Sequence, residues 1–458
     1  MELYCQSYLD QYDRNGVLNC ACGREHHLQT RQILLGEGAA EGLPGVLAER
    51  YGSAAKVWIL SDENTEEAAG RRCKQLLDRF VLSQTILPAS PKPRTSPDLI
   101  STLSAEAGEG FPDLILAVGG GTISDLAKMV SRDLEIPNWC VPTAPSVDAY
   151  SSGTSALKLS YRHKTEPARP AELIIADLDV LVKTPQLLFL SGVGDLLAKY
   201  LSYLDWRLSA LVTGETICEN TAGSCLESAR RAIGAVKTLA GDRRAAVRSL
   251  TDAILLSGLA MQALVSSRPA SSAEHTIAHF WELDHVVGNP DMELHGLLVG
   301  ISSRILLLIY KEFYDNPSLM RFDAADRLER LTSEPGWERA LTAEVRRFHR
   351  QIREEMEECE ISRAIISSRL ETVLNRRDSI LDLAGGLLGE LEQAVAILEG
   401  IGFPFRFSDY RFDPVRALVP IRYVRFLRNR YSSFNLMHEV GVEQKVLGLL
   451  DQRIEMIR

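Results

Sequence analysis

The chain has 458 residues, of which 45% are hydrophobic and 24% are charged. These fractions are typical of soluble globular proteins and argue against a disordered, collagen-like or coiled-coil chain. Acidic residues outnumber basic ones by 61 to 51, which gives a formal net charge of −10. Because recognition of a phosphate backbone needs a basic surface, we expect no nucleic-acid partner. The length predicts two or three domains with a large buried core.

We expect neither a secretory signal nor a membrane-spanning helix in this chain. The first residues, Met1 to Gln6, lack the basic start and apolar core of a secretory signal. The most apolar stretch, 296–310, is short for a bilayer span and contains Arg304, so we expect a buried helix and no membrane insertion. The eight cysteines are spread thinly along the chain, unlike a disulfide framework. A cytoplasmic location is the expectation.

One pair of cysteines stands close together, in the segment 20–23 with the sequence C-A-C-G, and His26 and His27 follow it. A zinc knuckle has C-x2-C spacing and a second pair of cysteines at finger distance, and this segment has neither. A tight hairpin turn with reduced thiols is therefore favoured over a metal site.

The first part of the chain alternates apolar runs of β-forming residues with helical stretches. Strands are expected at 57–60, 114–118, 139–143 and 173–177. Strands that are apolar throughout and separated by helices indicate a parallel sheet covered on both faces. A more polar segment between Leu157 and Glu172 predicts a hairpin.

After Pro185 the pattern changes to helical spacing of apolar residues, as in 196–208, 246–264 and 297–310. The charged region 327–399 is expected to form solvated helix faces. We therefore expect a Rossmann-like α/β nucleotide-binding domain over residues 1–185 and an all-α metal- and substrate-binding domain over residues 186–458. The active site of such a pair is expected in the cleft between the domains.

A glycine turn follows the strand at 114–118 and leads into a helix: Gly119, Gly120 and Gly121 precede Thr122 and Ile123. Glycines let the backbone approach a ligand, and the N-terminus of a helix favours an anion. The pattern is neither G-x-G-x-x-G nor a P-loop, and three glycines after a strand are as often a simple tight turn.

A carboxylate, Asp62, ends an earlier strand. At that position a carboxylate could accept the ribose hydroxyls of a dinucleotide. It could equally cap a helix or a turn, and its place in the sequence does not decide between the two.

Four of the nine histidines fall between positions 275 and 295: His275, His279, His285 and His295. His275 and His279 are four residues apart and would share one face of a helix. Asp195, in the segment G-V-G-D, is expected to open another helix. One carboxylate and two imidazoles fit a divalent site of zinc type that keeps a position for water or substrate. Ordinary surface or core histidines are the alternative.

Six segments occur in a fixed order: 119–125 (GGGTISD), 141–152 (VPTAPSVDAYSS), 176–179 (ADLD), 192–195 (GVGD), 274–279 (EHTIAH) and 295–296 (HG). With this combination the chain resembles the glycerol-1-phosphate dehydrogenases, in particular the bacterial branch. They belong to the superfamily of iron-type alcohol dehydrogenases, glycerol dehydrogenases and dehydroquinate synthases. The resemblance runs from about Cys20 to His295 and resumes near 423–431, and it implies a dehydroquinate synthase-like fold.

The resemblance implies roles for particular residues. The ligands of one divalent metal, zinc ahead of nickel or iron, would be Asp195, His275 and His295. The substrate would contact Asp148, Asp195 and His279, and His279 and Asp148 would assist proton transfer. NAD or NADP would lie along Asp62, Gly119, Gly120, Gly121, Thr122, Ile123, Thr143, Ser146 and Ser152.

Two differences from related families favour the glycerol-1-phosphate branch of the superfamily. Iron-type alcohol dehydrogenases have a histidine ligand four residues after the aspartate, where this chain has Lys199, and dehydroquinate synthases have a glutamate where this chain has Asp195. The implied reaction is the reversible reduction of dihydroxyacetone phosphate to sn-glycerol 1-phosphate, by a homodimer. A glycerol or other polyol dehydrogenase is the nearest alternative, and a non-catalytic binding protein that keeps the fold is a further one.

The substrate phosphate needs a basic anchor, and the first candidate is Arg268, just before the histidine helix. Further candidates are Lys199 and the segment with Lys158, Arg162, His163 and Lys164. Three arginines near the C-terminus are instead expected on the exposed side of an amphipathic helix: Arg425, Arg428 and Arg430.

Overall fold

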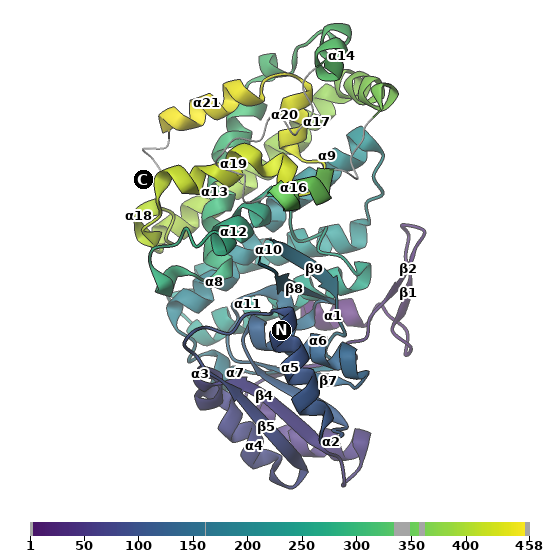
Figure 1. The fold of residues 1–458 in the computed structure, drawn as a ribbon, viewed down its shortest axis with the longest axis vertical. Coiled ribbons are helices and arrows are strands. Elements are labelled where there is room, and N and C mark those ends of the chain that lie inside the picture. Colours follow the sequence, from purple (N-terminus) through teal and green to yellow (C-terminus); the bar gives the residue numbers. More distant parts are fainter. Residues whose placement is uncertain (1–2, 161, 334–348, 357–361, 454–458) are drawn as a thin grey trace. The chain divides into compact units, whose positions relative to one another are not determined.

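The computed structural model describes residues 3–160, 162–333, 349–356 and 362–453, and these form two compact units (Figure 1). Unit 1 comprises Met1–Leu159, His163–Leu196 and Glu219–Ser267. Unit 2 comprises Ser160–Arg162, Leu197–Cys218 and Arg268–Arg458.

Unit 1 is built on a six-stranded sheet in which every neighbouring pair of strands is parallel, as the apolar runs predicted. The two edge strands, β3 and β5, were not predicted because their side chains are partly exposed and their apolar signal is diluted. In spatial order the strands are β3 (Gln32–Gly36), β10 (Leu173–Asp177), β7 (Asn138–Pro142), β6 (Leu114–Gly119), β4 (Val57–Asp62) and β5 (Val81–Leu87).

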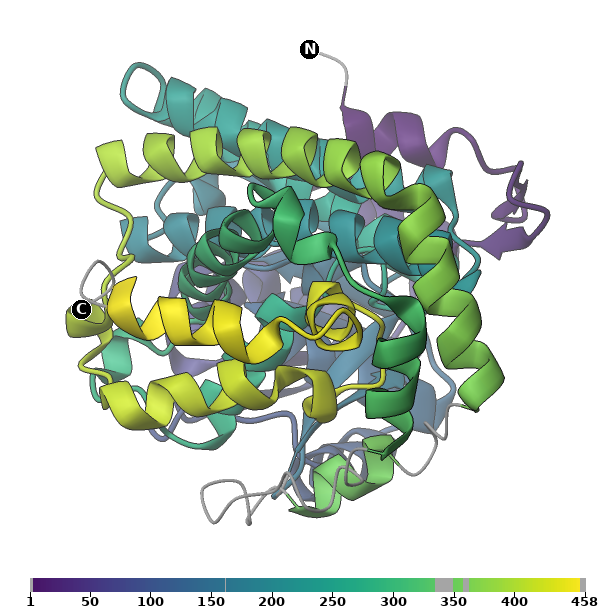
Figure 2. The same ribbon diagram turned by 90° about the horizontal axis from the view of Figure 1, so that it is seen from above.

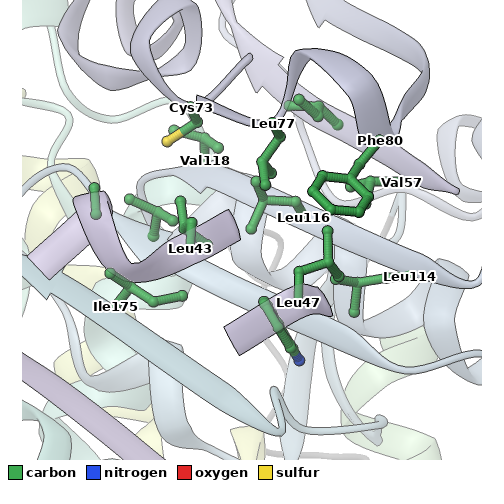
Figure 3. Close-up of a cluster of buried hydrophobic side chains, with 14 of the residues drawn as sticks. Leu43, Leu47, Val57, Cys73, Leu77, Phe80, Leu114, Leu116, Val118 and Ile175 are labelled. Carbon is green, nitrogen blue, oxygen red and sulfur yellow. The ribbon is translucent and has the colours of Figure 1, made fainter. Parts of the chain in front are cut away.

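Both faces of the sheet are covered by helices. Successive side chains of a strand point to opposite faces, so Val57 and Leu116 lie in one apolar cluster and Trp58 lies in the other. The first cluster, shown in Figure 3, packs under α2 (Leu43–Tyr51) and α4 (Arg71–Leu76). The second packs under α5 (Pro97–Gly108) and α6 (Gly121–Leu134). The predicted parallel sheet with helices on both faces is confirmed.

Two hairpins complete the β structure of unit 1. Strands β8 (Thr154–Lys158) and β9 (His163–Pro167) pair antiparallel, which confirms the hairpin expected there. Strands β1 (Val17–Asn19) and β2 (Glu25–His27) form a second hairpin, which confirms the turn expected at 20–23.

Two long helices from beyond residue 185 also belong to unit 1: α10 (Glu219–Leu239) and α11 (Arg243–Leu264). They pack against each other, and α11 also contacts α1 (Tyr4–Leu9) and the short helix η4 (Asp148–Ser151). No strand follows β10 among the described residues, so residue 185 separates the strands from the long helices there. As a domain boundary it stays a prediction.

A buried lysine ties α6 to the segment around η4. Lys128 is fully buried, and its Nζ lies 2.7 Å from Asp125 Oδ1. It also donates to Ala149 O at 2.9 Å, to Ser152 Oγ at 3.0 Å and to Thr154 O. A buried ammonium needs such partners, because removing one would leave an uncompensated charge. The segment 148–154 is therefore fixed relative to the helix that follows the glycine turn.

Unit 2 is helical throughout its described residues, as expected. The long α17 (Arg363–Gly400), yellow-green in Figure 2, packs against α9 (Lys199–Thr213) and α13 (His295–Tyr314). The remaining main helices are α12 (Ala273–Leu283), α14 (Ala324–Ser333), α16 (His349–Met356), α19 (Pro414–Leu427), α20 (Ser433–Glu439) and α21 (Glu443–Arg453).

One buried carboxylate joins four parts of unit 2. Asp205, in α9, accepts hydrogen bonds from Ser272 Oγ at 2.6 Å, from Tyr310 OH at 3.0 Å and from the amide and hydroxyl of Ser433 at 2.9 and 2.8 Å. Burial raises the pKa of Asp205 to about 6, against the opposing effect of these donors. The residue preceding α12 is thereby fixed to α9, α13 and α20.

The charged region 327–399 is described in part. Helix α14 buries none of its side chains, and α17 buries an apolar set on one side, including Leu370, Ile380 and Leu391, consistent with solvated charged faces. Residues 334–348 and 357–361 lie outside the described residues.

One helical stretch, Gln186–Thr213, has the length and apolar composition of a membrane-spanning helix, but 83% of its most apolar window is buried inside the structure. Stretch 296–310, singled out from the sequence, lies within α13, most of whose side chains are buried.

Candidate metal and nucleotide sites

The sheet of unit 1 has a topological switch point between β4 and β6. Strand β5 follows β4 on one side, whereas the chain then returns to place β6 on the other side. Leu60 is in register with Ala117, so Asp62 and Gly119, each two residues further on, end neighbouring strands at the same edge of the sheet. Ligands of open α/β sheets bind at this kind of position.

The glycine turn gives the switch point an open helix N-terminus. Gly120 precedes α6, no side chain caps this end of the helix, and a Cβ on Gly120 would meet nothing within 4 Å. In contrast, a Cβ on Gly121 would lie 2.6 Å from Val147 Cγ2, so packing requires glycine there. Thr122 and Ile123 form the first turn, and the Ile123 side chain is buried in the sheet core. An anion can therefore approach the first amides of α6.

Asp62 caps a helix in this structure. Its Oδ1 accepts from the Thr65 amide at 2.9 Å, and the Asp62 amide donates back to Thr65 Oγ1 at 2.9 Å. This reciprocal capping box is the alternative that the sequence left open. A contact between Asp62 and a ribose stays a prediction.

The three other residues predicted to contact the nucleotide lie in the segment after β7. The Thr143 amide donates to Gly119 O at 3.2 Å, so this residue lies beside the glycine turn. Ser146 Oγ is 3.2 Å from Tyr150 OH, and Ser152 Oγ accepts from the buried Lys128. The hydroxyls of Ser146 and Ser152 thus hold the segment together.

Asp148 and Asp195 are brought together within unit 1. The Asp148 amide donates to Asp195 Oδ2 at 3.0 Å, and Ser257 Oγ donates to Asp148 Oδ2 at 2.8 Å. The expectation that Asp195 opens a helix is wrong, because it lies near the end of α8 (Gln186–Leu197). Gly192 allows this helix to approach the loop after β7, since a Cβ there would lie 1.9 Å from Pro145 O.

Three of the four clustered histidines form one group in unit 2. The ring centroids of His275 and His295 are 5.4 Å apart, and the His279 ring stacks on that of His295 at 5.0 Å. His275 and His279 share α12, as predicted, and His295 begins α13. His285 is exposed between the two helices and lies outside the group.

Two buried glutamates orient the outer histidines. Glu274 Oε1 lies 2.9 Å from His275 Nδ1, and Glu282 Oε1 lies 2.8 Å from His295 Nδ1. An ionised carboxylate only accepts hydrogen bonds, so each Nδ1 carries the proton and each Nε2 keeps its lone pair. Histidines held in this way are typical metal ligands.

Neither glutamate was assigned a role from the sequence. Glu274 directly precedes His275, and Glu282 lies three residues after His279 and seven after His275, so the helical face of α12 carried the signal.

His279 is poised as a neutral imidazole. Burial lowers its pKa to about 4, although Glu282, whose Oε2 lies 3.6 Å from His279 Nδ1, opposes the shift. The neighbouring His295 and His275 lower the pKa further. At neutral pH this side chain can both accept and donate a hydrogen bond.

Arg268, the first candidate for binding the substrate phosphate, already forms an ion pair with a carboxylate. Arg268 is buried and binds Glu215 through two hydrogen bonds, from Nε at 3.0 Å and from Nη2 at 2.9 Å. Among the other candidates, Arg162 pairs with Glu354 at 3.0 Å, Lys164 pairs with Glu166, and Lys199 is fully buried in α9.

Two C-terminal arginines lie at the start of the histidine helix. The expectation that they belong to an amphipathic helix is wrong, because α19 ends at Leu427 and both lie beyond it. Arg430 Nη1 donates to Ser271 O at 2.7 Å, and Arg428 Nη1 donates to Ser271 Oγ at 3.2 Å. Burial, together with the charges of Arg428 and Arg268, brings the pKa of Arg430 well below its usual range. Such a concentration of positive charge favours an anion.

Comparisons with known proteins agree with this arrangement. A family model for iron-containing alcohol dehydrogenases matches residues 34–185. A glycerol-1-phosphate dehydrogenase [NAD(P)+] from Bacillus licheniformis is 33% identical over 307 residues, which are 66% of this chain and 76% of that protein. The maleylacetate reductase of Rhizobium sp. strain MTP-10005 shares the fold with a TM-score of 0.58 at 14% identity, covering 94% of this chain and 97% of its own. A sulfoacetaldehyde reductase from Bifidobacterium kashiwanohense, solved with NAD+, has a TM-score of 0.56 at 13% identity, covering 92% and 98%.

The last two glycines of the turn are expected to respond differently to replacement by alanine. Gly120→Ala places a methyl group in open space at the helix N-terminus, so it should weaken NADH binding about tenfold or more while costing about 1 kcal/mol of stability or less. Gly121→Ala forces Val147 to move and should lower the thermal midpoint clearly. Fluorescence titration with NADH and thermal unfolding of both variants check this, and equal NADH affinity in Gly120→Ala and the parent protein would contradict it.

The carboxylate of Glu282 is expected to strengthen metal binding through His295. Glu282→Gln removes the charge that orients the imidazole, so affinity for a divalent metal should fall about 10- to 100-fold. Competition with a chromophoric chelator measures the affinity. Asp291→Asn is the matched control, since Asp291 is an exposed acid just before α13. Equal affinities of the two variants would show that Glu282 has no such effect.

Proposed function

Because the chain belongs to the glycerol-1-phosphate dehydrogenase family, within the iron-containing alcohol dehydrogenases, we propose that it reversibly reduces dihydroxyacetone phosphate to sn-glycerol 1-phosphate. The reductant is NADH or NADPH, and a divalent metal takes part. The observation that carries this proposal is the pair of histidines, His275 and His295, each held by a buried glutamate.

The donors present fit a divalent metal. His275 and His295 each keep Nε2 available as a ligand atom, because the Nδ1 of each faces a carboxylate. Asp195 is proposed as the third ligand, and the Asp148 amide orients its carboxylate. Two imidazoles and a carboxylate accept zinc, nickel or ferrous iron, with zinc as the first choice. When bound, the ion supplies a Lewis acid that stabilises negative charge on the substrate oxygen.

The glycine turn is proposed to hold the pyrophosphate of the nucleotide. The first amides of α6, over Gly121, Thr122 and Ile123, donate to the phosphate oxygens, and Gly120 leaves room for them, whereas Gly119 packs against the Ile123 side chain. Thr143 lies beside this turn, and Ser146 and Ser152 keep its segment in place. Asp62 is proposed to accept from a ribose, where its charge would favour NAD over NADP.

His279 and Asp148 are proposed to orient the substrate and to assist proton transfer to its oxygen. Neutral His279 can form a hydrogen bond with one substrate oxygen. Asp148 is held by Ser257, which limits the rotation of its carboxylate.

The phosphate of the substrate is proposed to bind at Arg428, Arg430 and Ser271 rather than at Arg268. Arg268 already forms a two-point ion pair with Glu215, so its charge is largely compensated. Arg428 and Arg430 converge on Ser271, two residues before α12, and their mutual repulsion would be relieved by an anion. This placement also puts the phosphate near the end of α12 that carries His275.

The two arginines at Ser271 also help to distinguish the alternative functions. A glycerol or other polyol dehydrogenase would not need clustered arginines at the start of α12, because its substrate carries no phosphate. A homodimer and a cytoplasmic location come with the resemblance and stay predictions.

The deciding experiment compares dihydroxyacetone phosphate with dihydroxyacetone. Protein stripped of metal is given back zinc, nickel or ferrous iron, and oxidation of NADH and NADPH is followed. We expect kcat/KM to be on the order of 100-fold or more higher for the phosphorylated substrate, because charged hydrogen bonds to phosphate contribute about 1.5–3 kcal/mol each. Equal turnover of both compounds would support a polyol dehydrogenase, and no turnover with any metal would support a binding protein.

The proposed anchor is tested with Arg430→Met. Loss of one charged hydrogen bond should raise the KM for dihydroxyacetone phosphate about 10- to 100-fold and leave the KM for NADH nearly unchanged. Arg425→Met is the matched control, since Arg425 lies in α19 and pairs with Glu443 at 3.1 Å. An unchanged KM for the phosphorylated substrate in Arg430→Met would refute the anchor.

A further inference from the structure

The β1–β2 hairpin of unit 1 gathers three side chains that can bind a transition metal. Its turn is tight: the Gly23 amide donates to Cys20 O at 3.0 Å, and the Cys20 amide donates to Arg24 O at 3.0 Å. Gly23 has a φ of +82°, which a glycine adopts without strain. The turn places Cys20 and Cys22 on the same end of the hairpin as His26, which follows in β2.

The donor atoms are already close enough for one ion. Ligand atoms of Cys20, Cys22 and His26 lie within 4.8 Å of one another, and Cys22 Sγ is 3.3 Å from His26 Nε2. Around a tetrahedral zinc ion, with bonds of about 2.3 Å to sulfur and about 2.0–2.1 Å to nitrogen, neighbouring ligand atoms are about 3.5–3.8 Å apart. Small side-chain rotations would therefore complete the geometry.

His26 is oriented by a backbone hydrogen bond, as is typical of histidines that bind a metal. Its Nδ1 lies 2.9 Å from the backbone oxygen of Ala263 in α11. A carbonyl oxygen only accepts, so Nδ1 carries the proton and the lone pair of Nε2 faces Cys22. His26 is 2% exposed, whereas the next residue, His27, is exposed and lies 2.8 Å from Glu25.

The two cysteines of the turn are reduced. Neither Cys20 nor Cys22 forms a disulfide, so each thiol can lose its proton and coordinate a metal ion.

We propose that Cys20, Cys22 and His26 bind a zinc ion, with water in the remaining coordination position, separate from the metal at His275 and His295 and independent of the proposed function. Two thiolates and an imidazole are ligands characteristic of zinc. On binding, each thiol releases its proton to solvent. The ion would fasten the turn of the hairpin to α11 through His26.

The test uses cobalt in place of zinc in the full-length protein. A thiolate ligand gives Co²⁺ a strong sulfur-to-metal charge-transfer absorption in the near ultraviolet, which the aspartate and histidines of the other site cannot give. We expect this band in the wild-type protein and in His275→Ala, with two metal ions per chain in the former and one in the latter. Cys22→Ser and His26→Ala should lower the metal content by one ion per chain and remove or strongly weaken the band.

Two matched controls isolate the hairpin. Cys73→Ser alters a buried thiol in α4, and His27→Ala alters the exposed neighbour of His26, so both should keep the band and the metal content. A cobalt-loaded wild-type protein without the band would overturn the proposal, as would an undiminished band in Cys22→Ser. If the variants do not fold, thiol titration of the wild-type protein decides: zinc should protect Cys20 and Cys22 from modification, and equal reactivity with and without zinc would refute the site.

Discussion

The histidines of the candidate metal site are oriented by a series of buried hydrogen bonds in unit 2. Asp205 accepts from the Ser272 hydroxyl, the Ser272 amide donates to Glu274 at 2.6 Å, and Glu274 in turn holds His275. The same Asp205 is bonded to Tyr310 in α13, the helix that His295 begins. Because a buried carboxylate is destabilising unless donors surround it, the contacts around Asp205 stabilise one another. The orientation of the imidazole is therefore a property of the helical core.

The glutamates explain why His275 and His295 are oriented as metal ligands. A histidine whose Nδ1 faces a carboxylate has a defined tautomer and a more basic Nε2. His279 lacks a contact of that quality, and burial lowers its pKa to about 4, so it stays neutral. The three imidazoles thus have different tasks although they lie within one group.

The acidic balance of the chain is compatible with two phosphate-bearing ligands because charge acts locally. A net charge of −10 describes the whole molecule. At the glycine turn the amides of α6 provide partial positive charge, and at the start of α12 two guanidinium groups converge on Ser271. Close, partly buried charges are screened far less than distant surface charges, so these groups dominate the binding of an anion.

Apolar periodicity and short motifs are local signals, and they were enough to predict the parallel sheet, the helical character of the later residues and the family. The clustering of four histidines between positions 275 and 295 also indicated a metal site, and the resemblance to the family selected His275, His279 and His295 among them. The folded structure was needed to show that Arg268 is paired with Glu215 and that Arg428 and Arg430 meet Ser271. It likewise brought His26 to two cysteines on a turn that the C-x-C spacing had favoured as a plain hairpin. Glu215 lies 53 residues from Arg268, and Ser271 lies 157 residues from Arg428, so these partners are chosen by folding and no local sequence pattern records them.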